Sequence, residues 1–344
     1  MILGIESSCD ESALALYNAE VGIVGEWVHS QIIKHSEYGG VVPDIAVSEH
    51  LNNFFPLLSL AREKHLLSDV VSKIAVTCGP GLVGCLGVGI SVAKSLGLLW
   101  DVPVVGVNHL RGHAFSPFIS GNSLSKESLI EFLPHLGLLV SGGNTLLFSL
   151  DEKYIISIIA QTMDDAAGEA LDKGAKLLGI SYPGAAELEK RANEGDPNAY
   201  DFPIAFPEKK EMKFSFSGLK TSLLYTLKKM SESEVENHYA DLSASYQWAA
   251  VQQLVRKTSH AFEQCNYKSI GLSGGVANNK FLRSEMNKIA EDKGVPLLCA
   301  QPRHSGDNAT MIAFASCLDS ENAWSNDEQS LSFNPSLKLD DVPV

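Results

Sequence analysis

The sequence predicts an α/β fold from two observations. Short apolar segments of strand length alternate with longer amphipathic segments, and turns rich in glycine or serine follow several of the apolar segments. The predicted strands are Ile2–Ile5, Lys73–Thr77, Val102–Val107, Leu136–Val140, Thr145–Leu150, Tyr154–Ala160, Ser269–Leu272 and Pro296–Cys299. The predicted helices are Ala46–Lys64, Leu82–Leu99, Asp164–Leu178, Leu242–Cys265, Lys280–Lys293 and Ala309–Leu318.

Length and composition indicate a globular chain with room for two ordinary domains. The chain has 344 residues, of which 45% are hydrophobic and 20% charged. Glu6 and Asp10 stand in the first residues, so we expect no secretory signal there. The apolar window 74–100 contains a Gly-Pro-Gly break and Lys94, which predicts two separate elements and no membrane span. Six scattered cysteines without a C-x-x-C pair favour a reducing compartment and a cytoplasmic location.

The net charge of −14 argues against strong non-specific binding to nucleic acid, which depends on neutralising phosphates. A local basic patch is still compatible with this charge, because lysines cluster between residues 209 and 229. They are Lys209, Lys210, Lys213, Lys220, Lys228 and Lys229. A solvated helix and loop surface explains the same cluster without any ligand.

The stretch NHLRGHAF, residues 108–115, follows a short apolar run and contains a candidate metal pair. His109 and His113 are four residues apart, so on a helix both rings lie on one face, close enough to share a metal ion. In zinc peptidases with such a pair, a glutamate follows the first histidine as general base, whereas Leu110 stands here. The alternative is two ordinary half-buried histidines.

Asp307, in RHSGDNATMIAF, precedes a predicted apolar helix and has two interpretations. It is either the N-cap of that helix or a carboxylate ligand for a metal. Two histidines and one carboxylate with open coordination positions are a common catalytic set for Fe(II) or zinc. Sequence spacing does not connect Asp307 to the two histidines.

Two apolar runs end in Ser-Gly-Gly, at residues 138–145 and 270–279. Glycines after a strand let the backbone approach a ligand and offer N–H groups to an anion, although they also serve as tight turns. The repeated junction favours a nucleotide held between two related halves of the chain. Neither junction is a Walker P-loop or a complete G-x-G-x-x-G.

The stretch 164–179 reads as a helix with Asp165, Glu169 and Asp172 on one face. Such a row is either solvated or in contact with ribose hydroxyls, which carboxylates accept well.

Ten stretches resemble, in chain order, the motifs of the TsaD family, the transferase subunit of tRNA threonylcarbamoyladenosine synthesis, formerly labelled O-sialoglycoprotein endopeptidase. They are GIESSCDES (4–12), HSEYGGVVPD (35–44), CGPGLVG (78–84), NHLRGH (108–113), LLVSGGNT (138–145), DDAAGEALDKGAKLLG (164–179), SYPG (181–184), FSFSGLKT (214–221), SGGVANNKFLR (273–283) and GDNATMIA (306–313). The match runs from residue 1 to about residue 318.

The resemblance implies an actin-like fold, that of the acetate-kinase, sugar-kinase, Hsp70 and actin superfamily, with a nucleotide cleft between two α/β domains. We expect residues 1–115 together with 307–320 to form the lobe with the metal ligands, and residues 116–306 to form the second lobe. Residues 321–344 are acidic and are expected to be a loosely ordered tail.

The resemblance also implies the reaction and the partners. The threonylcarbamoyl group of threonylcarbamoyl-AMP is transferred to the N6 amine of adenosine 37, just 3′ of the anticodon, in tRNAs that read ANN codons, and AMP leaves. The implied protein partners are a truncated paralogue of the same fold, TsaB, and a small P-loop ATPase, TsaE. The implied cofactor is one divalent metal ion per subunit, Fe(II) or alternatively Zn(II).

Carried over position by position, His109, His113 and Asp307 match the family's metal ligands. The matches to adenylate contacts are Leu139, Val140, Ser141, Gly142, Gly143, Asp172, Ala185 and Asn279. The backbone N–H groups of Ser141–Gly143 are expected to bind the phosphate that leaves with AMP. Glu11 is a candidate for orienting the substrate or the acceptor amine.

This chain departs from the family pattern at two positions. Ala185 replaces a glycine, and Asn144 replaces a common histidine, so Asn144 is assigned no proton transfer.

Two other activities stay open: a metallopeptidase, which the absent glutamate after His109 disfavours, and a small-molecule kinase of the same fold.

Overall fold

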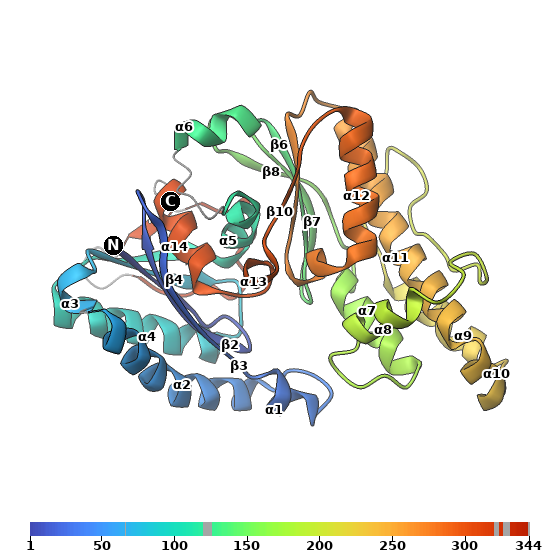
Figure 1. Ribbon diagram of the computed structural model, residues 1–344, viewed down its shortest axis with the longest axis horizontal. Helices are drawn as coiled ribbons and strands as arrows, with labels where there is room; N and C mark the ends of the chain where they lie inside the picture. Colours follow the sequence, from blue (N-terminus) through green and yellow to red (C-terminus); the bar gives the residue numbers. More distant parts are fainter. Residues whose placement is uncertain (66, 120–125, 320–322, 326–330, 343–344) are drawn as a thin grey trace. The chain divides into compact units, whose positions relative to one another are not determined.

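The computed structural model describes residues 1–65, 67–119, 126–319, 323–325 and 331–342, which form two compact α/β units (Figure 1). Unit 1 consists of Met1–Glu131 and Ala300–Val344, and unit 2 of Phe132–Cys299. Each unit has its own mixed sheet, six-stranded in unit 1 and five-stranded in unit 2. The predicted fold class is confirmed.

The sheet of unit 1 has the strand order β11-β5-β4-β1-β2-β3. Its strands are β1 (Ile2–Glu6), β2 (Glu11–Asn18), β3 (Gly22–Ser30), β4 (Lys73–Gly79), β5 (Val104–Asn108) and β11 (Trp324–Ser325). Strands β1, β4 and β5 are parallel, whereas β2, β3 and β11 run antiparallel to their neighbours. The parallel core brings the carboxyl ends of β1, β4 and β5 to one edge of the sheet, where Glu6, Gly79 and Asn108 lie.

Helices cover both faces of this sheet (Figure 1). On one face lie α2 (Pro43–Lys64) and α4 (Val83–Trp100), and on the other α5 (His109–Phe115) and α14 (Ala309–Leu318). A Cβ on Gly4 would lie 2.3 Å from the carbonyl oxygen of Ala309, so glycine is what lets the start of α14 reach strand β1. The shorter helices of this unit are α1 (Ile32–Ser36), α3 (Leu67–Val70), α6 (Lys126–Leu129) and α13 (Pro302–Ser305).

The apolar window 74–100 forms β4 and α4, so the prediction of two separate elements is confirmed. Among the described residues, α4 is the one helix whose length and hydropathy would suffice to cross a membrane. It packs against β4 and α2 through buried residues that include Leu86 and Ile90, as a core helix does.

The sheet of unit 2 has the order β10-β9-β6-β7-β8. Its strands are β6 (His135–Val140), β7 (Thr145–Leu150), β8 (Ile156–Gln161), β9 (Ser269–Ser273) and β10 (Leu297–Cys299). Strands β10, β9 and β6 are parallel, and β7 and β8 continue the sheet as antiparallel strands. The helices are α7 (Ala167–Leu177), α8 (Ala185–Ala192), α9 (Ser217–Leu227), α10 (Glu232–Asn237), α11 (Tyr239–Phe262) and α12 (Lys280–Lys293). Leu138, Tyr246 and Leu272 lie in its core.

The division between the units differs from the expected one at residues 115 and 306. Unit 1 extends to Glu131 and resumes at Ala300. In the second segment, His304 is fully buried and its Nε2 lies 2.7 Å from Oε1 of Glu26 on β3, which joins the segment to the sheet of unit 1.

Residues 331–342 also pack on unit 1, in contrast to the loosely ordered tail that we expected. Leu331, Leu337 and Leu339 are buried, and the backbone N–H of Asn334 donates to the carbonyl of Cys78 over 2.8 Å. The expected tail also includes residues 321–322, 326–330 and 343–344, which lie outside the described residues.

Candidate functional site

Helix α5 presents the two histidines of the NHLRGHAF stretch together. It begins at once after β5, because the Asn108 side chain caps it by accepting a hydrogen bond from the Leu110 N–H over 2.9 Å. The rings of His109 and His113 meet edge to face with centroids 4.7 Å apart. Both residues are buried, as is every residue of the helix. The spacing of four therefore places the two rings side by side inside unit 1.

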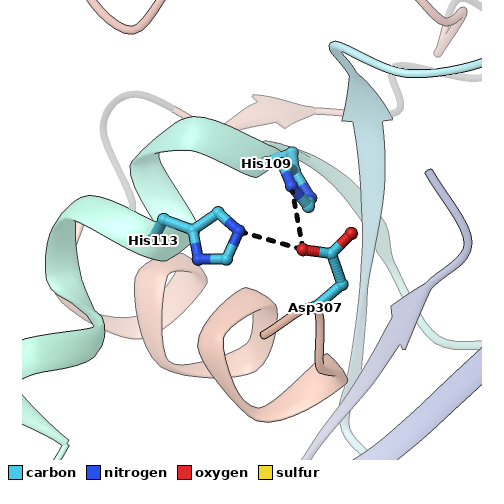
Figure 2. A group of neighbouring side chains, drawn as sticks. All are labelled: His109, His113 and Asp307. Atoms are coloured by element: carbon cyan, nitrogen blue, oxygen red, sulfur yellow. Dashed lines mark hydrogen bonds and ion pairs between the residues drawn. The ribbon is translucent and has the colours of Figure 1, made fainter. Parts of the chain in front are cut away.

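Asp307 completes this cluster from the other end of the sequence. The N-cap of α14 is Asn308, whose side chain accepts from the Met311 N–H over 2.9 Å, so the Asp307 carboxylate is not occupied by capping. Its Oδ1 lies 3.0 Å from Nε2 of His113 and 3.5 Å from Nε2 of His109 (Figure 2). One ligand atom from each residue lies within 4.8 Å of the others.

These three side chains fit a divalent transition metal. Two imidazole nitrogens and a carboxylate oxygen are the donor set that Fe(II) and Zn(II) accept while keeping further coordination positions open. The Asp307 side chain is 22% exposed, whereas the His113 side chain is 1% exposed. Solvent therefore reaches the cluster at the Asp307 carboxylate.

Glu6 is a buried neighbour of the cluster that the sequence prediction missed. It lies at the end of β1 with no exposed surface, and its Oε2 is 3.1 Å from Nδ1 of His109. Burial alone would raise the pKa of the Glu6 carboxyl, but the adjacent His109 keeps that pKa below its ordinary value. A charged residue at the end of the otherwise apolar run ILGIE is the signal in the sequence that points to it.

The charged groups of the His109, His113 and Asp307 cluster stabilise one another. Burial opposes the charged form of His109, yet Asp307 and Glu6 together raise the pKa of its imidazole. Burial likewise opposes the charged form of Asp307, and the two histidines lower the pKa of its carboxyl. A metal ion that binds here therefore displaces a proton from His109.

Glu11 stands at the start of β2, and its Oε1 accepts a hydrogen bond from the Ser30 hydroxyl over 3.0 Å. Burial, with the charges of Asp307 and Asp10, raises the pKa of its carboxyl to about 10. Glu11 lies in the same unit as Asp307 and is close enough for the charge of that candidate ligand to act on its carboxyl.

The two Ser-Gly-Gly junctions lie side by side in unit 2, so their expected assignment to two related halves of the chain is wrong. They follow β6 and β9, which are parallel neighbours with Leu139 opposite Ser273. A Cβ on Gly274 would lie 2.3 Å from the carbonyl oxygen of Val140, which requires glycine where the two turns touch. Gly142 and Gly143 instead face open space, with nothing within 4 Å of a Cβ placed there.

The first junction leaves fewer backbone donors than the sequence indicated. The Ser141 N–H donates to the carbonyl of Asn144 over 2.8 Å, which closes the turn into β7. Among the described residues, no hydrogen-bond acceptor is found for the N–H groups of Gly142 and Gly143. Two of the three expected N–H donors therefore remain for an anion.

Asp172 and Asn279 flank these turns with their side chains already in use. Oδ1 of Asp172 accepts from the backbone N–H groups of Gly184 and Ala185, both over 2.8 Å, at the start of α8. Asn279 caps α12 through its Oδ1, and its Nδ2 donates to Oε1 of Gln247 over 2.8 Å. Each keeps one polar atom for a ligand, namely Oδ2 of Asp172 and one amide N–H of Asn279.

The expected acidic face on the stretch 164–179 forms only in part, since Glu169 and Asp172 lie three residues apart on α7 whereas Asp165 does not lie on the helix. Helix α7 begins only at Ala167, so Asp165 precedes it, and both Asp165 and Glu169 pair with Lys173 at 2.9 and 2.8 Å. Of the three carboxylates, Asp172 alone contacts the start of α8.

Comparison with known proteins assigns the family. The model of the family described as TsaD, tRNA N6-adenosine threonylcarbamoyltransferase, matches residues 22–314. A protein of that name from Thermosipho africanus (strain TCF52B) is 40% identical over 340 residues, which cover 98% of this chain and 100% of the relative. The chain belongs to the TsaD family. A second relative of that name, from Herminiimonas arsenicoxydans, is 40% identical over 319 residues, covering 92% of this chain and 91% of its own.

More distant solved structures confirm the actin-like fold of this TsaD family member. HypF from T. kodakarensis superposes with a TM-score of 0.57 at 17% identity over 93% of this chain, which spans 47% of the HypF chain. Component A of the Acidaminococcus fermentans (R)-2-hydroxyglutaryl-CoA dehydratase gives a TM-score of 0.52 at 15% identity, covering 91% of this chain and 95% of its own.

Proposed function

We propose that this chain transfers the threonylcarbamoyl group from threonylcarbamoyl-AMP to the N6 amine of adenosine 37 in tRNAs that read ANN codons. Full-length similarity to proteins named tRNA N6-adenosine threonylcarbamoyltransferase carries the proposal. The retention of His109, His113 and Asp307 as one cluster supports a catalytic chain rather than an inactive paralogue. A cytoplasmic location, where tRNA is available, is part of the same proposal.

His109, His113 and Asp307 are proposed to hold one divalent metal ion, Fe(II) or alternatively Zn(II). When bound, such an ion supplies Lewis-acid polarisation of carbonyl or phosphoryl oxygens. Leu110 follows His109 at the position where zinc peptidases carry their general base, so peptide hydrolysis has no local proton acceptor.

Unit 2 is proposed to hold the adenylate of the donor. The N–H groups of Gly142 and Gly143 point to a phosphate site, because the backbone is open to a ligand there. Oδ2 of Asp172 is suited to a ribose hydroxyl, and Asn279 to a polar group of the base. The methyl group of Ala185, which replaces the family's glycine, packs against the core of unit 2.

In the proposed reaction, the N6 amine of adenosine attacks the carbamoyl carbon. A C–N bond forms, the bond between that carbon and the phosphate oxygen breaks, and AMP leaves with the electron pair while the amine loses one proton. Donors at Gly142 and Gly143 stabilise the charge that develops on the phosphate. Burial raises the pKa of the Cys9 thiol strongly, so this cysteine is a poor covalent nucleophile.

Two protein partners are proposed from the family: the truncated paralogue TsaB and the ATPase TsaE. The exposed face of α2 that carries Leu51 and Phe55, four residues apart, is the proposed contact for TsaB, with Phe55 exposed to 78%. Phe55→Lys is expected to abolish co-elution with TsaB in size-exclusion chromatography. Ile155→Lys, at an exposed apolar position of unit 2, is the matched control. Equal co-elution of both variants would contradict this contact.

The test of the reaction is nucleoside mass spectrometry of the tRNA. The purified chain is incubated with unmodified ANN-reading tRNA, threonylcarbamoyl-AMP, TsaB and TsaE. Threonylcarbamoyladenosine is the expected product. Its absence, together with phosphoryl transfer from ATP to a small molecule, would overturn the proposal in favour of the kinase alternative.

A further inference from the structure

We propose that Glu6 is a positioning residue: its carboxylate accepts the Nδ1–H of His109 and thereby presents Nε2 of that ring to the metal. This inference rests on the proposed metal site. It assigns a role to a residue that contacts the nitrogen of His109 that does not face Asp307. Its starting point is a fully buried carboxylate at the end of β1, in contact with a candidate ligand.

The carboxylate of Glu6 is fixed by groups other than the histidine. Its Oε1 accepts the backbone N–H of Ser8 over 2.6 Å, and its Oε2 accepts the hydroxyl of Thr77, on the neighbouring strand β4, over 2.5 Å. Both oxygens are therefore held before His109 is considered. A buried carboxylate is costly unless its hydrogen bonds are satisfied, and here they leave Oε2 aimed at the imidazole.

The hydrogen bond decides which nitrogen of His109 can bind a metal. Both Glu6 oxygens already accept hydrogen bonds, from the Ser8 N–H and the Thr77 hydroxyl, so Oε2 is also the acceptor toward Nδ1 of His109, 3.1 Å away, and Nδ1 carries the shared proton. When the ring gives up its other proton to bind a metal, the lone pair lies on Nε2, the atom that faces Oδ1 of Asp307 at 3.5 Å. Carboxylate partners of this kind fix the orientation of a ligating histidine and raise its basicity.

The second histidine provides an internal contrast. Nδ1 of His113 is buried and has no hydrogen-bond partner among the described residues, so no carboxylate holds this ring through Nδ1. Its position comes from helix α5 and from the contact of Nε2 with Asp307. The support is thus specific to His109, although the Ser8 hydroxyl, 3.2 Å from the same Nδ1, is a second neighbour.

The test is the affinity of the purified full-length chain for Zn(II), measured by competition with a chromophoric chelator. Glu6→Gln keeps the shape of the side chain and removes its charge, and we expect it to weaken binding by about 10- to 100-fold. His109→Ala is the reference for loss of a ligand. Ser269→Ala, which removes the hydroxyl 2.7 Å from the buried His135 in unit 2, is the control and should bind Zn(II) like the natural chain.

The outcomes separate the inference from the metal site itself. Weak binding by both Glu6→Gln and His109→Ala supports the role of Glu6. Weak binding by His109→Ala alone overturns that role and keeps the metal site. Natural affinity in His109→Ala overturns the metal site, and the inference with it.

A measurement on the natural chain covers the case in which Glu6→Gln does not fold. Nuclear magnetic resonance of the Zn(II)-loaded protein with 15N-labelled histidine rings distinguishes a metal-bound nitrogen from a protonated one. We expect Nε2 of His109 to bind zinc and Nδ1 to carry a proton. Zinc on Nδ1 of His109 would overturn the proposal.

Discussion

The candidate sites of the two units are built in opposite ways. In unit 1, the candidate site consists of side chains: His109, His113 and Asp307 converge, and the buried Glu6 contacts His109. In unit 2, the candidate site consists of backbone that lacks side chains, since Gly142 and Gly143 leave N–H groups open. A metal needs donor atoms in a fixed geometry, whereas an anion is bound well by exposed amide groups.

This difference predicts different responses to substitution. Truncating one of the candidate metal ligands of unit 1 should lower the rate of the reaction while the chain still folds. Adding a side chain at Gly274 of unit 2, where the two turns touch, should disturb the packing.

The largest effect is expected for His109→Ala. It removes one metal ligand and with it several kcal/mol of transition-state stabilisation, which corresponds to a rate loss of more than about a hundredfold. The measurements are the rate of threonylcarbamoyladenosine formation and the free energy of unfolding. Full activity would show that the cluster has no part in the reaction.

A destabilising effect is expected for Gly274→Ala in unit 2. The new Cβ would lie 2.3 Å from the carbonyl oxygen of Val140, at a residue with φ of +86°. Such strain costs about 1–3 kcal/mol of unfolding free energy. Gly275→Ala is the matched control, because nothing lies within 4 Å of its Cβ. Equal stability of both variants in urea unfolding would contradict the close packing of the turns.

The stability of unit 2 should also respond to acid through His135. Burial lowers the pKa of this imidazole to about 3, against 6.5 for the ordinary group. The folded state keeps His135 neutral, while the unfolded state takes up a proton below pH 6.5, so stability falls as the pH drops below that value. The slope is at most about 1.4 kcal/mol per pH unit. Urea unfolding of the natural chain and of His135→Asn between pH 7 and pH 5 checks this, and identical slopes would refute it.

The smallest effect is expected for the lysine cluster between residues 209 and 229, which we propose as a tRNA contact on the strength of the family's substrate. Lys209 already pairs with Glu263 at 2.8 Å, so part of its charge is balanced within the chain. Glutamate at Lys209 and Lys213 should weaken tRNA binding and reduce its salt slope by about 1 for each lost phosphate contact. Lys268→Glu is the control, since this lysine also forms a surface ion pair, with Glu152. If all variants bound tRNA with the same affinity, the lysine cluster would be a solvated surface without a role in tRNA binding.

The sequence was sufficient where local patterns determine structure. Apolar runs next to glycine-rich turns predicted β1, β4, β6 and β7 correctly. The spacing of His109 and His113 predicted that both lie on one face of a helix. Strand β2 was missed because ESALALYN is rich in alanine and leucine, which favour helices. Strand β3 was missed although GIVGEWVHS carries valine, isoleucine and tryptophan. Strand β2 pairs with β1, and β3 pairs with β2, so the strand conformation of both depends on tertiary pairing.

Contacts between distant residues were not predictable from spacing. Asp307 reaches α5 because α14 packs on β1 at Gly4, and Glu6 meets His109 because β1, β4 and β5 end at one edge. The adjacency of the two Ser-Gly-Gly turns depends on the pairing of β6 with β9, which are separated by most of unit 2 in sequence. No local pattern specifies which parallel strands become neighbours.

Centrally, we propose that His109, His113 and Asp307, and not cysteine thiols, hold the metal. X-ray absorption spectroscopy of the Zn(II)-loaded chain tests it most directly. We expect nitrogen and oxygen ligands at about 2.0–2.2 Å, with an imidazole contribution that decreases in His113→Ala. Sulfur ligands at about 2.3 Å, or a spectrum unchanged in His113→Ala, would contradict the account.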